Sequence, residues 1–422
     1  MPTPQSVHFR RVAVAAIALL TSSALGAQRP PAGQRGVVCE ADNGGLDLPS
    51  GFCARTFASN LGPVRQLVVT PDGVLYAALS GSAGDGTGGV LAYRDRDGDG
   101  TPDERASFGP GGGNDVKLHD GYLYFARNTS IVRWRLTPGK LEPDARMETV
   151  VSGLPAGGHG AKSVIFLGDT MLVNFGSASN SCQQTDRLPA SPGKDPCPEL
   201  AERAGIWAFA ANRTGQTAAD GRRWATGLRN AMALAIEPRT GLLYAGVHGM
   251  DQLRQSWGFS NEVNANNPAE LFAQVQPGQN YGWPYCYFSN QYNRMVTAPE
   301  YGGDGSRSER CTGVSRPAIA FPGHWAPMAI AFYTDTAFGP AYRGGAFMAW
   351  HGSWNRAPLP QEGYRVVFIP FRDGRPEGTY QTFAIGRDGP TALRATGVAV
   401  APDGSLYISA DQNGKIWRVV HR

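Results

Sequence analysis

The sequence predicts an all-β fold, a six-bladed β-propeller of four-stranded antiparallel blades, from its density of turns and from six imperfect repeats. Its 55 glycines and 31 prolines are spread along the chain, and no long stretch has helical periodicity. Many short strands between frequent turns are typical of an all-β protein. Six repeated units favour a propeller, because blades packed around an axis bury the sheet faces that one blade alone leaves exposed.

Each repeat has an alternating apolar strand, a turn and a second strand. The expected hairpins span residues 67–79, 116–125, 163–175, 233–247, 329–350 and 398–409. Three of the turns contain Asp-Gly, at 72–73, 120–121 and 403–404, and this pair readily adopts the positive φ of tight hairpins. Third strands are expected at 90–93, 131–136, 206–209, 364–370 and 416–420. The last strand is expected to close the ring by pairing near residues 52–57. The alternative fold is a pair of irregular β-sandwiches.

The N-terminal segment is expected to be an export signal. Arg10 and Arg11 precede an apolar run at 12–20, and small residues follow up to Ala27, which is the order found in secretory signal peptides. The apolar run is too short to span a bilayer. We therefore expect a signal peptide at 1–27, a flexible leader at 28–38 and a single propeller domain at 39–422. Such a protein would be periplasmic or secreted.

Charge and cysteine content narrow the class of protein further. The net charge of +4 falls to +2 when Arg10 and Arg11 leave with the signal, and no basic patch is concentrated enough to predict a nucleic-acid partner. No segment after the signal is apolar enough to predict a membrane span. Export would permit disulfides. The favoured pairs are the sequence-local ones, Cys39–Cys53, Cys182–Cys197 and Cys286–Cys311, while other pairings stay open.

Six short motifs follow one another along the chain. They are Gly158-His159-Gly160-Ala161-Lys162, Gly227-Leu228-Arg229-Asn230, His248-Gly249-Met250, Asn280-Tyr281-Gly282-Trp283-Pro284, His351-Gly352-Ser353-Trp354-Asn355-Arg356, and Arg394 ahead of a Pro-Asp-Gly turn. In this order they resemble the glucose/sorbosone dehydrogenase family of quinoprotein propellers over about residues 45–420. The spacing in the first motif is similar to that of the sorbosone-type branch. Lys162 departs from the family, in which an Arg is more usual at this place.

The resemblance implies a sugar dehydrogenase that uses pyrroloquinoline quinone. His159 would be the general base that takes the proton of the sugar's anomeric hydroxyl while hydride moves to the quinone, and an imidazole with a pKa of about 6.5 suits this work. Arg229 would bind the cofactor with Asn230 and stabilise the electron density that arrives on the quinone. Arg356 and Arg394 are further cofactor-binding candidates, because the three carboxylates of the cofactor require fixed cations. Without the resemblance, such a lone His or Arg is more often structural.

The resemblance also implies calcium. Gly249 and Met250 match a place where family members hold the ion through backbone carbonyls, and calcium prefers oxygen ligands. Glu270 and Tyr281 match a second calcium position. The spacing between these two is one residue longer here than in the family.

A separate calcium signal stands in the first repeat. Asp95, Asp97 and Asp99 form a D-x-D-x-D-G pattern, which directs alternate carboxylates toward one point as calcium loops do. Ala106 stands where an EF-hand has its bidentate Glu. The alternative is therefore a solvated Asp-rich hairpin.

Three functions remain open on the sequence, and the first is favoured. The chain would be a quinoprotein dehydrogenase of an aldose or a related hydroxy-carbonyl sugar, a calcium-dependent hydrolase of the lactonase type, or a propeller that only binds carbohydrate or protein. A lactonase would hold calcium with acidic side chains in the axial cleft and would not need Arg229 and Arg394. A binding protein would not need His159. Because the chain has no C-x-x-C-H haem motif, a dehydrogenase would pass its electrons to a separate acceptor.

Overall fold

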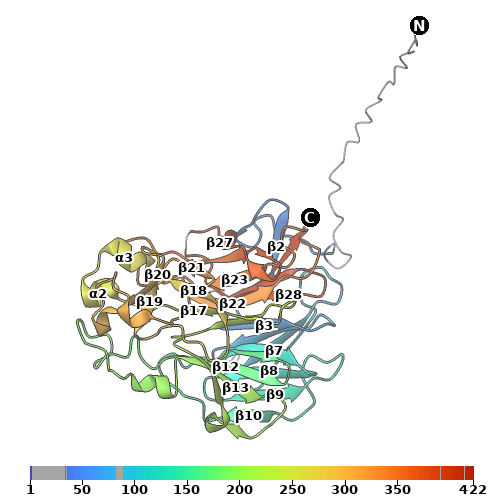
Figure 1. Ribbon diagram of the computed structural model, residues 1–422. Helices are drawn as coiled ribbons and strands as arrows, with labels where there is room; N and C mark the ends of the chain where they lie inside the picture. Colours follow the sequence, from blue (N-terminus) through green and yellow to red (C-terminus); the bar gives the residue numbers. More distant parts are fainter. Residues whose placement is uncertain (2–33, 35, 82–88, 390, 413) are drawn as a thin grey trace.

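Six four-stranded antiparallel sheets follow one another along the chain and surround a common axis (Figure 1). The computed structural model describes residues 1, 34, 36–81, 89–389, 391–412 and 414–422. Apart from Met1, the expected signal peptide lies outside the described residues, and so does most of the expected leader. Gln34 and Val37, at the end of that leader stretch, are buried.

The first three blades are built from consecutive strands. Blade 1 consists of β3 (Val64–Val69), β4 (Leu75–Leu79), β5 (Val90–Arg94) and β6 (Glu104–Phe108). Blade 2 consists of β7 (Gly113–His119), β8 (Tyr122–Arg127), β9 (Ile131–Arg135) and β10 (Glu148–Ser152), with β14 (Gln216–Thr217) added at its edge. Blade 3 consists of β11 (Val164–Leu167), β12 (Thr170–Phe175), β13 (Gly205–Ala210) and β15 (Arg222–Thr226).

The last three blades complete the ring. Blade 4 consists of β16 (Ala233–Ile236), β17 (Leu243–Val247), β18 (Glu270–Val275) and β21 (Ile319–Phe321). Blade 5 consists of β22 (Pro327–Phe332), β23 (Ala346–Trp350), β24 (Arg365–Ile369) and β27 (Gln381–Gly386), with β1 (Leu46–Asp47) at its edge. Blade 6 consists of β28 (Ala395–Val400), β29 (Leu406–Ala410), β30 (Lys415–His421) and β2 (Phe52–Ala58). The expected closure is confirmed, because Phe52 pairs with His421 and Cys53 with Val420.

The expected hairpins are the inner strand pairs of the six blades, so the propeller is confirmed and the sandwich alternative is wrong. The inner strands β3, β7, β11, β16, β22 and β28 each contact the next one around the axis. Apolar side chains fill the spaces between blades. For example, Phe347 and Phe383 of blade 5 share a core cluster with Ile408 and Trp417 of blade 6.

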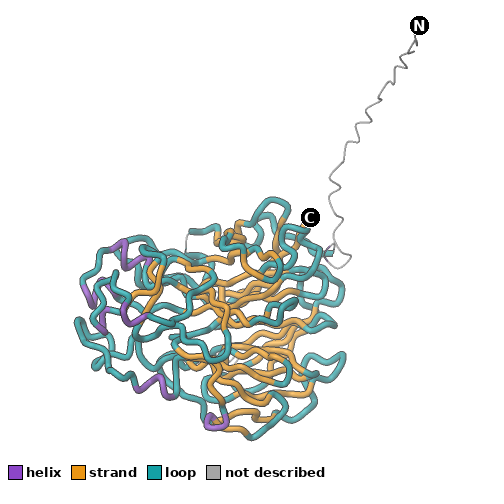
Figure 2. The backbone as a smooth tube through the Cα atoms, viewed as in Figure 1, coloured by secondary structure: helices purple, strands orange, loops and turns teal. Residues whose placement is uncertain are grey.

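Helices are short, and most lie beside the blades at the left of Figure 2, whereas the turn Ala218–Asp220 lies between β14 and β15. They are α2 (Leu253–Trp257), α3 (Asn261–Asn266) and the 3-10 turns Pro198–Ala201, Ala218–Asp220, Pro299–Tyr301 and Glu309–Cys311. Two small hairpins, β19 (Cys286–Ser289) with β20 (Arg294–Thr297) and β25 (Phe371–Arg372) with β26 (Arg375–Pro376), complete the described elements. All three expected disulfides are confirmed, and two of them, Cys182–Cys197 and Cys286–Cys311, hold segments of the long loops.

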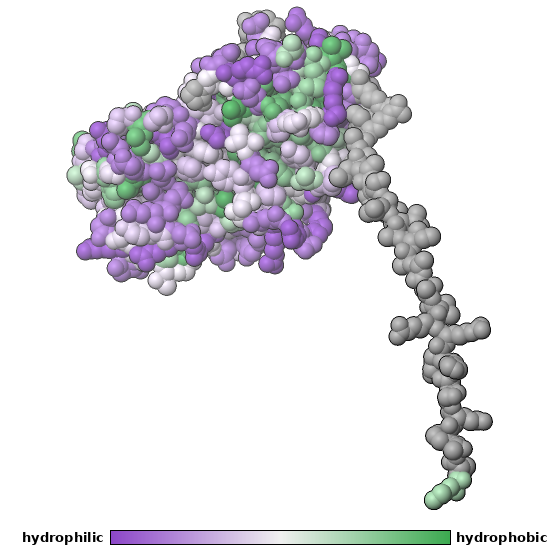
Figure 3. Space-filling view, turned by 90° about the horizontal axis from the view of Figure 1, so that it is seen from above, coloured by the Kyte–Doolittle hydropathy of each residue, from purple (hydrophilic) through white to green (hydrophobic). Residues whose placement is uncertain are grey.

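Polar side chains connect several blades at the centre of the ring. The Gln66 side-chain amide donates to the carbonyls of Met232 and Met328, which belong to the entries of blades 4 and 5. Lys117 of blade 2 donates to the Gln66 amide oxygen at 3.3 Å. In the described part of the chain, no helix has the length and apolar character needed to cross a membrane. Figure 3 shows one face of the molecule, where hydrophilic residues predominate and apolar ones are interspersed.

Candidate active site

His159 lies at the entry of blade 3, and among the described residues only its Nδ1 has a hydrogen-bond partner. Its Nδ1 is 3.0 Å from both the carbonyl oxygen and the hydroxyl oxygen of Ser177. The carbonyl can only accept, and the Ser177 hydroxyl already donates to Ser179 O at 2.7 Å. Nδ1 therefore carries the hydrogen and donates, which leaves the lone pair on Nε2. Burial, aided by the charges of Arg229 and His248, lowers the pKa of His159 to about 3, so the ring is neutral.

Arg229 and Asn230 lie directly beside His159. The main chains of His159, Ser177 and Arg229 run side by side, because His159 N–H donates to Ser177 O and Ser177 N–H donates to Arg229 O. Gly176 permits this approach, since a Cβ there would lie 2.5 Å from the His159 Cβ and 2.8 Å from the Asn230 Oδ1. The structure thus brings these three predicted residues together.

Asp251 is the counter-ion of Arg229, and the sequence reasoning missed it. Arg229 is 4% exposed, and its Nη2 lies 3.1 Å from Asp251 Oδ2. Burial alone would raise the pKa of Asp251, but the charges of Arg229, His324 and Arg187 outweigh burial and hold that pKa well below its usual range. Its position in the sequence could have identified it, because Asp251 directly follows the motif His248-Gly249-Met250.

Arg394 belongs to a second charged group across the axis. Its Nη2 donates to His351 Nδ1 at 3.0 Å, so the other nitrogen of that ring carries the hydrogen and donates to Asp411 at 2.9 Å. Arg65 Nη1 binds the same carboxylate at 3.0 Å. The Nε of Arg394 is buried and has no hydrogen-bond partner within the described residues. His351 stood in a predicted motif without a role, and neither Arg65 nor Asp411 carried a sequence signal.

The residues predicted to hold calcium gather around a small cavity next to Arg229. Gly249, Met250 and Tyr281 line this cavity, whose volume is about 30 Å³, enough for one water-sized occupant. Glu270 lies beside it and accepts the Gly249 N–H at 3.2 Å. Burial raises the pKa of Glu270 to about 7, against the opposing effect of His324. The Gly249 carbonyl accepts from Arg229 Nη1 at 2.7 Å, and the Tyr281 hydroxyl is directed elsewhere, toward Gln274 O at 2.7 Å.

Arg356 does not join either charged group. It is 5% exposed, and its guanidinium donates to the carbonyls of Ala265 and Pro360 and lies 3.3 Å from the Glu362 carboxylate. These contacts hold the loop between β23 and β24 against α3. Its donors are therefore engaged in loop structure.

The aspartate loop of blade 1 has the shape of a cation loop. Ligand atoms of Asp95, Asp97 and Asp99 all lie within 4.8 Å of one another. The Asp95 carboxylate accepts the N–H groups of Gly98 and Gly100 and binds Arg418 at 2.6 Å. Its position is therefore fixed with or without an ion.

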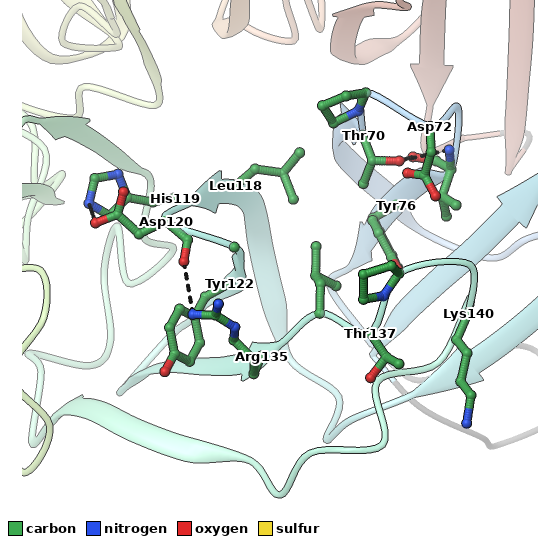
Figure 4. A pocket seen from close by; sticks show the side chains of 15 residues that line it. Thr70, Asp72, Tyr76, Leu118, His119, Asp120, Tyr122, Arg135, Thr137 and Lys140 are labelled. Atoms are coloured by element: carbon green, nitrogen blue, oxygen red, sulfur yellow. Dashed lines mark hydrogen bonds and ion pairs between the residues drawn. The ribbon is translucent and has the colours of Figure 1, made fainter.

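Two pockets of substantial size lie at opposite ends of blades 1 and 2. A pocket of about 530 Å³ lies beside the segment that carries His159, and Arg65, Asn114, Asn128 and Gly158 are among its lining residues. A pocket of about 700 Å³ lies at the other end of the same strands, between the turns at Asp72 and Asp120 (Figure 4). Figure 4 shows Tyr76, Tyr122 and Arg135 along this second pocket, which contains none of the predicted site residues.

Comparison with known proteins finds a matching family. Residues 46–422 match the family described as TrAA12-like. A pyrroloquinoline quinone-dependent pyranose dehydrogenase of Coprinopsis cinerea is 26% identical over 242 residues, which cover 47% of this chain and 31% of that protein. An uncharacterized protein of Borreliella burgdorferi is 27% identical over 202 residues, covering 47% of this chain and 48% of its own. The chain thus matches less than half the length of these curated relatives.

Solved structures share the fold at low sequence identity. The holo form of the pyranose dehydrogenase PQQ domain from Coprinopsis cinerea aligns with a TM-score of 0.72 and 19% identity over 89% of this chain and 97% of that domain. The calcium structure of a Trichoderma reesei AA12 enzyme aligns with a TM-score of 0.74 and 18% identity over 92% and 98%. The soluble aldose sugar dehydrogenase of Escherichia coli aligns with a TM-score of 0.60 and 16% identity over 88% and 100%. These likenesses support the propeller.

Proposed function

Because the chain belongs to the TrAA12-like family, we propose that it is an oxidoreductase that binds pyrroloquinoline quinone in its axial cleft and oxidises a sugar. The observation that carries the proposal is the state of His159. Its Nδ1 is held by Ser177, its Nε2 has no partner in the described structure, and Arg229 and Asn230 lie beside it. A neutral imidazole next to fixed cations is what proton removal near an anionic cofactor requires.

The charged residues suit a cofactor with several carboxylates. Arg394 has a buried donor that no described residue satisfies, and an unsatisfied buried donor favours an acceptor from a ligand. Arg229 and Arg65 supply two further guanidiniums near the axis, each held in place by an aspartate. When bound, the quinone would accept the hydride of the sugar. Arg356 takes no part in this proposal, because its donors are used within its own loop.

His159 would act on the sugar and not on the cofactor. Its Nε2 would take the hydroxyl proton, and Ser177 would keep the ring oriented through Nδ1. The pKa of about 3 reflects burial next to Arg229. An anionic ligand beside the ring would raise that pKa, because an opposite charge favours the protonated imidazole. The base would therefore become stronger in the loaded cleft.

Calcium would bind at the small cavity through the backbone carbonyls of Gly249 and Met250. Glu270 and Tyr281 would belong to a second calcium position beside it. A carbonyl oxygen has two lone pairs, so the bond from Arg229 leaves one on Gly249 for an ion. The axial acids Asp251 and Asp411 are already paired with guanidinium and imidazole groups. This pairing disfavours the lactonase alternative, which needs free axial carboxylates.

The finer features of the proposal follow from the same resemblance. The substrate would be an aldose or a sorbosone-type sugar, and a separate protein or molecule would take up the electrons. Three disulfides favour an oxidising compartment. With the expected signal peptide, they support a periplasmic or secreted location.

Binding of the quinone to the apoprotein is expected to require calcium and to weaken when Arg394 is replaced by alanine. Losing a charge-assisted hydrogen bond costs roughly 1.5–3 kcal/mol, so the Kd should rise about 10-fold to 150-fold. Isothermal titration calorimetry with and without a chelator measures both effects. A matched control is Arg387→Ala, which removes an exposed arginine bound to Asp47 at the rim. Equal affinity in parent, variant and chelated protein would remove the cofactor claim.

We also propose that Asp95, Asp97 and Asp99 bind calcium. The double variant Asp97→Asn, Asp99→Asn keeps Asp95 and its bond to Arg418 but removes two of the charges. In the parent, calcium at about 100 times its Kd should stabilise the fold by roughly 2.7 kcal/mol, and the variant should lose most of this gain. Thermal unfolding at several calcium concentrations tests it. If calcium shifts parent and variant equally, the loop is only a solvated hairpin.

A further inference from the structure

The segment that carries His159 is held by two cationic side chains. Lys162 is 1% exposed, and its Nζ donates to Pro155 O at 2.9 Å and to Gly160 O. Arg203 donates to Gly157 O at 3.0 Å and to Ala156 O. Four carbonyls of one short segment therefore accept from these two residues, and His159 stands inside that segment.

Lys162 is an unfavourable residue to bury here. Within the described residues, no carboxylate forms a salt bridge with it, and the centroid of the Phe175 ring lies 5.8 Å from Nζ. Burial, aided by the charge of Arg203, lowers the pKa of Lys162 to about 7. A buried ammonium loses its solvation by water, and without a counter-ion only hydrogen bonds compensate for that loss. Here the compensating bonds are those to the carbonyls of Pro155 and Gly160, and the same bonds hold the segment.

The segment is also fixed on its other side. His159 N–H and Nδ1 both bind Ser177, and Gly158 lies so close to Ala178 that a Cβ there would be 2.2 Å from the Ala178 carbonyl oxygen. Two groups of residues therefore hold the main chain around His159. Ser177 and Ala178 form one group, and Lys162 and Arg203 form the other. Removing the cations would leave the segment anchored on one side only.

We propose that Lys162, together with Arg203, is a positioning residue that fixes the 155–160 segment and so directs Nε2 of His159 into the cleft. The claim that Lys162 directs a catalytic base rests on the proposed function, whereas the claim that Lys162 fixes the segment does not. A misplacement of about 1 Å at a reacting group can lower a rate by about 100-fold. The effect should therefore fall on kcat and leave KM and cofactor affinity nearly unchanged.

The test compares Lys162→Met, which has similar length without donors, with Lys162→Arg, which keeps the donors. In the apoprotein, the His159 amide, which donates to Ser177 O, should exchange its hydrogen about 10-fold faster or more in Lys162→Met, because local opening becomes easier. Lys162→Arg should restore slow exchange. In the enzyme loaded with quinone and calcium, kcat should fall about 10-fold to 100-fold in Lys162→Met and recover in Lys162→Arg. Arg203→Ala, at a half-exposed residue, provides a second variant if Lys162→Met does not fold.

Arg133→Met is the matched control. Arg133 is also buried and also donates to a carbonyl, that of Ala211 at 3.2 Å, but it lies away from His159 in blade 2. It should lower the melting temperature without changing kcat or the exchange of the His159 amide. Unchanged exchange in both Lys162→Met and Arg203→Ala would overturn the proposal, and so would faster exchange with parent kcat. If the parent protein oxidises no sugar, the proposed function fails, and the exchange measurement still decides whether Lys162 holds the segment.

Discussion

Replacing His159 with alanine is expected to leave quinone binding nearly intact and to slow sugar oxidation by about 10²–10⁴-fold, the usual contribution of a general base. The ring bonds only to Ser177 in the described structure, and its free Nε2 would meet the substrate proton. Stopped-flow reduction of the bound quinone by a panel of aldoses measures the chemical step directly. Calorimetry on the same variant measures cofactor affinity.

A second histidine provides the control for this experiment. His119 packs on Phe166 with ring centroids 4.3 Å apart, at the far end of blade 2, and His119→Ala should keep the parent rate. NMR of the apoprotein should show His159 neutral down to a pH of about 3. Since an unfolded histidine takes up its proton near pH 6.5, this residue lowers stability progressively as the pH falls below that value. A His159→Ala variant that reduces the quinone at the parent rate would contradict the assignment.

The fold was predictable because its signals are local. The Asp-Gly turns and alternating apolar strands lie within each hairpin, and five third strands followed from the same alternation. The third strand of blade 4, β18, was missed because α2 and α3 separate it from β17. The pairing that closes the ring could be predicted by one further inference. The last strand needed an antiparallel partner, and the unassigned strand was near the N-terminus.

The site was predictable only where a short motif carried it. His159, Arg229 and Asn230 stand in such motifs, and the structure places them side by side. Arg65 and Asp411 could not be found this way, because they are 346 positions apart and meet only through closure of the ring. Arg356 stands in a motif but does not join the charged groups of the site. The motif could not reveal that the donors of Arg356 are used by nearby carbonyls.

Replacing Arg229 with alanine is expected to weaken quinone binding, slow the reaction and destabilise the fold at the same time. Arg229 is 4% exposed and forms a buried pair with Asp251. Removing one partner of a buried pair costs about 3–5 kcal/mol, because the other charge stays behind. In the variant, Asp251 would keep Arg187 and His324, so its pKa would lie less far below the usual range than in the parent. The parent therefore gains more stability from this carboxylate at neutral pH and loses that gain as the pH falls, so urea unfolding of parent and variant should converge in acid.

Two further variants separate the structural role of Arg229 from its proposed role toward the cofactor. Arg187→Ala removes a more exposed partner of the same carboxylate and should cost no more than about 1 kcal/mol. The double variant Arg229→Ala, Asp251→Asn removes both charges of the buried pair, so it should regain part of the stability at neutral pH. It should not regain quinone affinity, because it still lacks the guanidinium of Arg229. If the double variant recovers both stability and affinity, Arg229 is a structural residue only, and the cofactor must be held by other cations.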